Sequence, residues 1–203
     1  MYRSGLKRCL DLFGGTLALL AVSPILLLIA LMVRSRLGSP VLFVQTRPGL
    51  HGQSFNIVKF RTMRNDRGPD GRPLPDEARL TRFGALLRST SLDELPELWN
   101  VIKGEMSLVG PRPLLTQYLD RYSPAQARRQ DMRPGLTGLA QVRGRNALTW
   151  HEKFALDVEY VERCSLWLDL KILFLTMGQV AARHGVSQPG RATMDEFVGS
   201  ALQ

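Results

Sequence analysis

The stretch GGTLALLAVSPILLLIALMV, residues 14–33, decides how this chain folds and where it lies. It belongs to a run of 22 residues, 12–33, that contains no charged side chain. A helix of this length, at about 1.5 Å of rise per residue, reaches across the roughly 30 Å of hydrocarbon in a bilayer. The run therefore indicates association with a membrane and excludes a soluble domain with evenly mixed surface charge.

A proline in the middle of this run argues against a straight spanning helix. Pro24 lacks the backbone N–H and clashes with the preceding turn, so it divides the run into halves of 11 and 9 residues, each too short to span. Because Lys and Arg concentrate on cytoplasmic flanks, we predict a re-entrant helix–break–helix anchor over residues 1–36, with Ser23 and Pro24 at the bend. The basic residues that flank the run are Arg3, Lys7, Arg8, Arg34 and Arg36.

Two other interpretations of the run stay open at this point. One is a spanning helix that Pro24 only kinks. The other is a cleaved signal peptide, which fits less well because apolar residues resume directly after any small-residue cleavage site near Ser23. In the re-entrant form we expect the Ser23 hydroxyl to bond a backbone carbonyl that Pro24 leaves without a donor.

The remainder of the chain, residues 37–203, mixes short strand and helix patterns. Strands are predicted at 41–45 and 54–60, joined as a β-hairpin by the turn sequence RPGLHG, and at the MSLVG segment. Because both types of pattern occur, the fold class is α+β and mostly helical, in a single unit over residues 1–203. Helices are predicted at 79–88, 91–103, 114–132, 150–163 and 166–180.

Two of these helices carry further expectations. Ser91 and Glu94 have the capping-box spacing at the start of one helix, and Gly104 is expected to end it. The 166–180 helix is too apolar for a surface helix and too short to span a bilayer. It therefore lies either in the core or in the plane of a membrane interface, and we favour the interface.

The charge balance points to a partner that carries phosphate. The sequence has 27 basic and 18 acidic residues, and 22 of the basic ones are arginine, whose planar fork suits phosphate or carboxylate. Between residues 112 and 145 there are seven arginines against two aspartates. The two cysteines lack the spacing of a zinc site or a disulfide framework, which excludes both classes of small stapled domain.

Adjacent carboxylates, Asp93 and Glu94, stand at the start of a predicted helix. Taken alone they are ordinary helix stabilisers, because anionic side chains are favoured in the first turn. Beside an arginine cluster and a membrane segment, however, they suggest Mg²⁺ held by carboxylates and a phosphorylated substrate held by arginine forks. An aspartate can also attack phosphorus itself and form an acyl phosphate.

Five sequence blocks, in order along nearly the whole chain, resemble the bacterial sugar transferases called monotopic phosphoglycosyl transferases. They are SPILLLIALMV, KFRTM (59–63), LRSTSLDELPELWNVIKGEMSLVGPRP (87–113), RPGLTGLAQVRGRN (133–146) and KFALDVEYV (153–161). The end segments MYRSGLKR and GVSQPGRATMDEF further resemble the bacillosamine-type branch, which starts protein glycosylation. The resemblance implies one catalytic domain that transfers a sugar 1-phosphate from a UDP-sugar, such as UDP-diacetamidobacillosamine, to undecaprenyl phosphate and releases UMP.

The same resemblance implies roles for single residues. Asp93 would be the nucleophile that forms a phosphosugar intermediate, and Glu94 together with Asp93 would bind Mg²⁺. Ser23 and Pro24 match the helix break of the family's membrane anchor. The residues implied to bind the nucleotide, steady phosphates or support the site are Lys59, Arg88, Arg112, Pro113, Arg145 and Asp157.

The expected partners are a UDP-sugar, polyprenyl phosphate and membrane lipid, with no nucleic acid, at the cytoplasmic face of the bacterial inner membrane. A homodimer and downstream glycosyltransferases are further partners to consider. One rival function is a non-catalytic basic membrane protein that binds anionic lipid or nucleic acid, which leaves the Asp-Glu pair unexplained. Another is an aspartyl-phosphate type of lipid phosphatase, which would turn over without polyprenyl phosphate.

Overall fold

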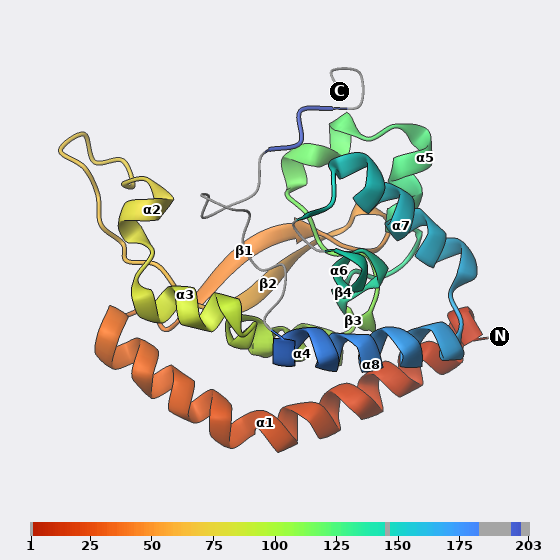
Figure 1. The fold of residues 1–203 in the computed structure, drawn as a ribbon, viewed down its shortest axis with the longest axis horizontal. Coiled ribbons are helices and arrows are strands. Elements are labelled where there is room, and N and C mark those ends of the chain that lie inside the picture. Colours follow the sequence, from red (N-terminus) through yellow and green to blue (C-terminus); the bar gives the residue numbers. More distant parts are fainter. Residues whose placement is uncertain (1, 145–146, 183–195, 200–203) are drawn as a thin grey trace.

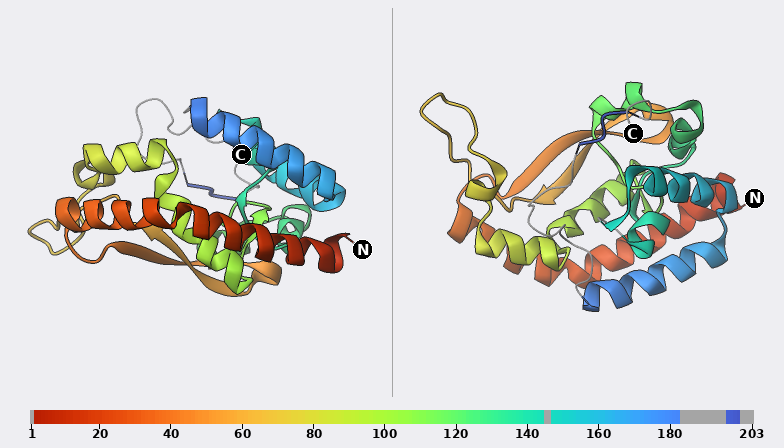
Figure 2. Two further views of the ribbon diagram at one scale, coloured as in Figure 1. Left: turned by 90° about the horizontal axis from the view of Figure 1, so that it is seen from below. Right: turned by 45° about the horizontal axis from the view of Figure 1, so that its top comes forward.

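The computed structural model describes residues 2–144, 147–182 and 196–199 of the chain. A long helix, α1, underlies one edge of the molecule, and the remaining elements gather on one side of it (Figures 1 and 2). The helices after α1 (Lys7–Leu37) are α2 (Asp76–Arg79), α3 (Arg82–Ser89), α4 (Leu98–Lys103), α5 (Pro124–Ala127), α6 (Leu139–Arg143), α7 (Trp150–Arg163) and α8 (Leu166–Ala182).

Helix α1 is continuous through Pro24, so the prediction of two separate helical halves is wrong. The helix instead bends near its middle, with its convex side away from the rest of the protein (Figure 1). The Ser23 hydroxyl donates to the carbonyl of Leu20 at 2.8 Å, which is the carbonyl that an N–H at position 24 would have used. This bond, expected from the sequence, satisfies the carbonyl that Pro24 leaves without a donor at the point where the helix bends.

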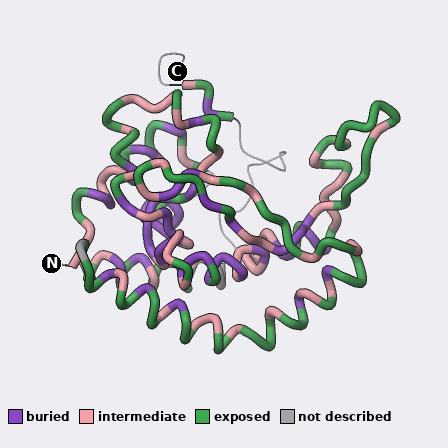
Figure 3. The backbone as a smooth tube through the Cα atoms, turned by 180° about the vertical axis from the view of Figure 1, so that it is seen from behind, coloured by how far each residue is buried: buried purple, intermediate pink, exposed green. Residues whose placement is uncertain are grey.

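Both ends of α1 pack against the rest of the protein while its middle does not (Figure 3). Asp11 and Gly15 are buried near one end, and Ile29 and Val33 near the other. Within the part of the chain that is described, α1 alone is long and apolar enough to cross a membrane, judged by length and composition.

The predicted β-hairpin is confirmed. Strand β1 (Leu42–Pro48) pairs antiparallel with β2 (Ser54–Phe60), from Leu42 opposite Phe60 to Pro48 opposite Ser54. A second pair, β3 (Ser107–Val109) and β4 (Gly135–Thr137), is parallel. The MSLVG strand is thus confirmed as β3, whereas β4 was not predicted because glycines stand at its start and directly after its end, and glycine is depleted in strands.

The predicted helices over 150–163 and 166–180 correspond to α7 and α8, and Gly104 ends α4 with a left-handed φ of 84°. The helix predicted over 114–132 is wrong as a continuous element. It consists of the 3₁₀ turns Thr116–Arg121 and Arg128–Asp131 with the short α5 between them. Pro124 explains the interruption, because it disfavours a helical conformation at the preceding residue.

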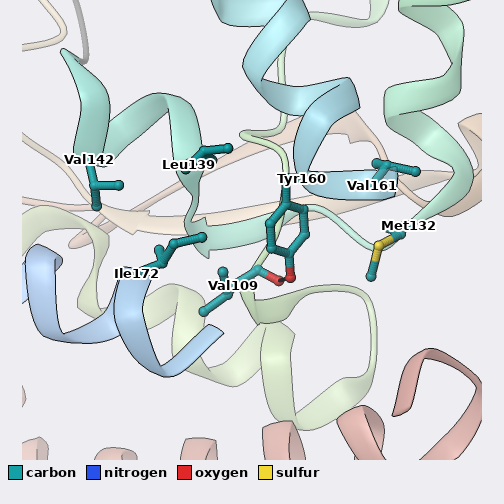
Figure 4. Packing of buried hydrophobic residues seen from close by; sticks show 7 residues of the cluster. All are labelled: Val109, Met132, Leu139, Val142, Tyr160, Val161 and Ile172. Carbon is teal, nitrogen blue, oxygen red and sulfur yellow. Dashed lines mark hydrogen bonds between the residues drawn. The ribbon is translucent and has the colours of Figure 1, made fainter. Parts of the chain in front are cut away.

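One core cluster joins β3, α6, α7 and α8 (Figure 4). Tyr160 lies fully buried at its centre, and its hydroxyl oxygen lies within hydrogen-bonding distance of two acceptors, an Asp169 carboxylate oxygen at 2.7 Å and the Val109 carbonyl oxygen at 2.9 Å. Lys7 reaches the same carboxylate at 2.5 Å. This buried polar contact fixes the N-terminal end of α1 against α8.

Helix α8 is two-sided rather than wholly buried or wholly exposed. Ile172 is completely buried, whereas Trp167 and Phe174 are 79% and 72% exposed. A helix with large apolar side chains in the open is suited to a membrane interface, the location that we favoured from the sequence.

Candidate active site

Asp93 and Glu94 lie on a 3₁₀ turn, Leu92–Glu97, and not on the first turn of an α-helix as predicted. Ser91 adopts a left-handed conformation with φ of 56°, and its side chain caps nothing, so the predicted capping box is wrong. The left-handed residue directs the chain away from the end of α3 at Ser89. A 3₁₀ turn aligns residues three apart, so Glu94 and Glu97 stand on the same side, facing β2.

Glu94 is the centre of the charged contacts in this region. Its Oε1 atom accepts from Lys59 Nζ at 2.7 Å and from Arg112 at 2.5 Å. Lys59 comes from β2, and Arg112 comes from the turn after β3, so the fold brings both cations to the carboxylate from distant parts of the sequence. Arg112 is about half exposed, with 45% of its side chain accessible, so it is open to a ligand from solvent while it contacts Glu94.

The two cations keep Glu94 ionised. Burial alone would raise the pKa of Glu94, but Arg112 and Lys59 outweigh it and lower this pKa below the ordinary range. The same pairing acts on Lys59, whose pKa is raised because Glu94 and Glu97 outweigh the effect of burial. Glu94 and Lys59 are therefore both charged at neutral pH.

Asp93 differs from its neighbour. It is 8% exposed, and within the described residues its carboxylate forms no hydrogen bond or ion pair. Burial, followed by the charge of Glu94, raises the pKa of Asp93, while Lys59, Arg88 and Arg112 oppose that rise. The result is an unengaged carboxylate surrounded by three cations, which is an arrangement suited to attack on a phosphorylated substrate.

Arg88 and Pro113 border this carboxylate region. Arg88 stands in the last turn of α3, and its Nε donates to Thr62 at 3.0 Å. Its guanidinium group forms no other hydrogen bond or ion pair within the described residues, which leaves two nitrogens for an anion. Pro113 is buried next to Arg112. The prediction for Arg145 lies outside the described residues.

Asp157 does not reach the Asp-Glu pair directly. It is 3% exposed and accepts two bonds from Arg129, at 2.7 and 3.0 Å, on its Oδ2 atom, while the buried Oδ1 has no hydrogen-bond partner among the described residues. Arg129 in turn donates to the backbone carbonyl of Arg112 at 2.6 Å. Asp157 thus connects to the site through Arg129 and the Arg112 backbone.

Sequence reasoning missed Glu97 and Arg129. Glu97 is 2% exposed, and its Oε1 lies 3.0 Å from Lys59 Nζ. The three-residue spacing from Glu94 would have indicated Glu97 only if the 3₁₀ geometry had been known. Arg129 gave no signal, because it was one of seven arginines in its region and its partner is distant in sequence.

Glu97→Gln should make folding less sensitive to pH. Burial raises the pKa of Glu97 to about 7 from 4.5, so the unfolded chain ionises this group first and the folded protein loses stability as pH rises between these values. When pH rises from about 5 to about 8, the free energy of unfolding of the variant should increase by roughly 2 to 3 kcal/mol relative to that of the parent protein. Thermal or urea unfolding in detergent at both pH values measures this. If the variant and the parent protein differ in free energy of unfolding by the same amount at the two pH values, Glu97 does not hold its proton in the folded state.

The Asp-Glu pair also fits a magnesium ion shared with substrate. The described residues contain no group of three or more His, Cys, Asp or Glu arranged to hold a metal ion. Mg²⁺, however, commonly takes one or two carboxylates and completes its shell with water and substrate phosphates. The carboxylate of Asp93 and the second oxygen of Glu94 are hard oxygen donors of the right kind.

A comparison with known protein families identifies the family to which the chain belongs. The family described as bacterial sugar transferase matches residues 2–183, which include every contact described above. The chain belongs to the bacterial sugar transferase family. The family resemblance inferred from the five sequence blocks is therefore confirmed.

Similar bacterial sugar transferases come from several organisms. An uncharacterized sugar transferase, EpsL, of Bacillus subtilis (strain 168) is 52% identical over 96% of both chains. The UDP-glucose:undecaprenyl-phosphate glucose-1-phosphate transferase of Caulobacter vibrioides is 46% identical over 84% of this chain and 68% of its own. The exopolysaccharide production protein ExoY of Rhizobium meliloti is 41% identical over 88% of this chain and 87% of its own.

Proposed function

We propose that this protein transfers a sugar 1-phosphate from a UDP-sugar to undecaprenyl phosphate and releases UMP. The observation that carries the proposal is the buried carboxylate of Asp93, which has no partner among the described residues and is surrounded by Lys59, Arg88 and Arg112. The name of the Caulobacter relative, which states this reaction for glucose, supports it. The reaction would be the first membrane step in assembling a glycoconjugate.

The chemistry proceeds in two displacements. An oxygen of Asp93 attacks the phosphorus bonded to the sugar, a P–O bond to Asp93 forms, and the bond to the UMP phosphate breaks. An oxygen of polyprenyl phosphate then attacks the same phosphorus, and the Asp93 carboxylate leaves. Because UMP departs before the lipid arrives, both substrates use one anion site in turn.

The other residues supply charge and position. Arg112 and Arg88 offer guanidinium donors to phosphate oxygens, and Lys59 holds Glu94 in its ionised form. Asp93 and Glu94 would hold Mg²⁺, which when bound neutralises phosphate charge in the transition state. Pro113 fixes the backbone next to Arg112.

The membrane arrangement is part of the same proposal. The bent α1, with both ends against the protein and its apolar middle exposed, would dip into the cytoplasmic leaflet of the bacterial inner membrane and return. A site beside such an anchor meets a soluble nucleotide sugar and a lipid phosphate without removing the lipid from the membrane. Cysteine labelling in vesicles tests this, because residues 1 and 60 should lie on the same side, and opposite sides would mean that α1 spans.

The reaction is tested with purified protein and UDP-sugar in the absence of lipid acceptor. We expect about one UMP released per protein and a mass increase equal to the sugar phosphate. Addition of undecaprenyl phosphate should then remove the adduct and start turnover. Continuous turnover without the lipid would instead indicate a phosphatase, and absence of any UMP would favour a non-catalytic lipid-binding protein.

The sugar of the donor is tested by a panel of nucleotide sugars. The similarity of the chain's end segments to the bacillosamine-type branch makes UDP-diacetamidobacillosamine our proposed donor. Curated relatives are named for glucose and for galactose, so UDP-glucose and UDP-galactose are the comparison substrates. A higher kcat/KM for either of these would reject the acetamido sugar.

A further inference from the structure

A hollow of about 410 Å³ lies between the C-terminal end of α1 and the start of α3, apart from the Asp-Glu pair. Its walls include three arginines from three different segments: Arg36 near the end of α1, Arg64 after β2, and Arg82 at the start of α3. Leu37 and Phe83 form part of its apolar lining. Figures 1 and 2 both show α3 beside this half of α1.

The three arginines have no acidic partner. In the described part of the chain none of their guanidinium groups forms an ion pair or hydrogen bond. The guanidinium group of Arg36 instead lies over the ring of Phe83, 4.9 Å from its centre, in a cation–π contact. The nearby Arg79 differs, because it pairs with Asp76 at 2.6 Å. Three unpaired cations that line one concavity repel one another unless an anion joins them.

The position of the hollow suggests what that anion is. The turn of α1 that leads to it carries large exposed apolar side chains, including Leu27, Leu28 and Leu31. If these lie in hydrocarbon, Arg36 and Arg82 stand at the level of the lipid headgroups, where arginine meets phosphate. Phe83 and Leu37 then face the region between headgroup and acyl chain.

The hollow is separate from the proposed catalytic site. Arg82 begins α3, whereas Arg88 lies in its last turn, so six residues of helix, about 9 Å, separate the two. A phosphate bound by Arg82 is therefore not the phosphate next to Asp93.

We infer that Arg36, Arg64 and Arg82 bind the phosphate of an anionic phospholipid in the leaflet that receives α1. The inference rests on the proposed membrane anchoring, although not on the transferase chemistry. Such a site would hold the end of α1 at a fixed depth, and with it the start of α3.

Native mass spectrometry of the full chain in detergent micelles tests this. The micelles are doped with phosphatidylglycerol, phosphatidylcholine or undecaprenyl phosphate, and a fourth sample contains inorganic phosphate. We expect a phosphatidylglycerol adduct several times more abundant than the phosphatidylcholine adduct. Arg82→Gln and Arg36→Gln should each reduce it about five-fold, as expected for loss of one arginine near a lipid phosphate.

Two control variants sharpen the result. Arg72→Gln removes an arginine whose side chain is 86% exposed on the neighbouring loop, outside the hollow, and should leave the adduct unchanged. Arg82→Lys keeps the charge but loses the fork, and should weaken binding more than Arg72→Gln does. Circular dichroism checks that each variant is folded.

The outcomes separate the possible sources of phosphate. Equal loss in Arg72→Gln and Arg82→Gln would mean diffuse attraction and would overturn the site, as would equal binding of phosphatidylcholine. Binding of undecaprenyl phosphate alone, or of inorganic phosphate alone, would also reject a phospholipid site. UMP release, measured in parallel, reports on the transferase proposal independently, and flotation with phosphatidylcholine vesicles reports on the anchor.

Discussion

Replacing Asp93 with asparagine is expected to abolish the phosphosugar adduct and the release of UMP from UDP-sugar. Asparagine has nearly the same shape but cannot act as the attacking carboxylate, so the first displacement has no nucleophile. We expect a loss on the order of 10³-fold or more in kcat/KM, as is typical when a covalent nucleophile is removed. Intact-protein mass spectrometry and a UMP assay measure the two quantities separately.

The same substitution should not destabilise the protein. The carboxylate of Asp93 makes no hydrogen bond or ion pair within the described residues, so the substitution by asparagine removes no such interaction among them. Burial raises the pKa of Asp93, so the folded state disfavours its ionised form, and this unfavourable contribution is fully present once pH exceeds the raised pKa. At neutral pH the variant should therefore unfold at an equal or higher temperature than the parent protein.

A matched control separates loss of the nucleophile from loss of any aspartate. Asp120→Asn changes an exposed residue outside the site and should retain adduct formation and turnover. A sugar-phosphate adduct that persists in Asp93→Asn would assign the nucleophile to another group. Loss of activity together with a clearly lower unfolding temperature would mean that Asp93 is structural.

The sequence predicted those parts of the site that depend on local pattern. Asp93 and Glu94 are adjacent, and their resemblance to a family motif predicted them directly as candidate site residues. The hairpin that carries Lys59 also followed from alternation and turn residues. These features need only neighbours in the chain, so the sequence was enough to find them.

Features that depend on tertiary contacts were not predicted. The left-handed Ser91 and the following 3₁₀ turn give no periodic signal, since the same letters fit a capping box. Glu97 looked like an ordinary helix residue until the fold placed Lys59 3.0 Å away. Helix α1 shows the opposite case, because a local rule for proline predicted a break, whereas the helix continues through Pro24 as a bend.

Arg129→Met is expected to destabilise the protein by about 3 to 5 kcal/mol, the usual effect of removing one partner from a buried ion pair. Arg129 and Asp157 are 4% and 3% exposed. Burial raises the pKa of Asp157, and Arg129 opposes that rise, so without Arg129 the carboxylate would remain buried without its ion-pair partner. Urea unfolding in detergent measures the change.

The double variant Arg129→Met with Asp157→Leu separates two roles of Arg129. One is to neutralise the buried Asp157, and the other is to hold the backbone of Arg112. Replacing both partners by apolar groups avoids an isolated buried charge, so much of the stability should return. Recovery of less than about 1 kcal/mol relative to Arg129→Met alone would mean that lost packing, not the unpaired charge, explains the single variant.

Activity should not return with stability in that double variant. Arg129 donates to the Arg112 carbonyl at 2.6 Å, and Arg112 binds Glu94 at 2.5 Å. The Arg129–Asp157 ion pair therefore fixes the turn that carries Arg112, whose guanidinium group we propose binds substrate. Without this bond we expect the KM for UDP-sugar to rise by about ten-fold, the equivalent of about 1.4 kcal/mol, which is close to the lower end of the range for a hydrogen bond to a charged group. Full recovery of both stability and KM would instead limit Arg129 and Asp157 to holding the fold together.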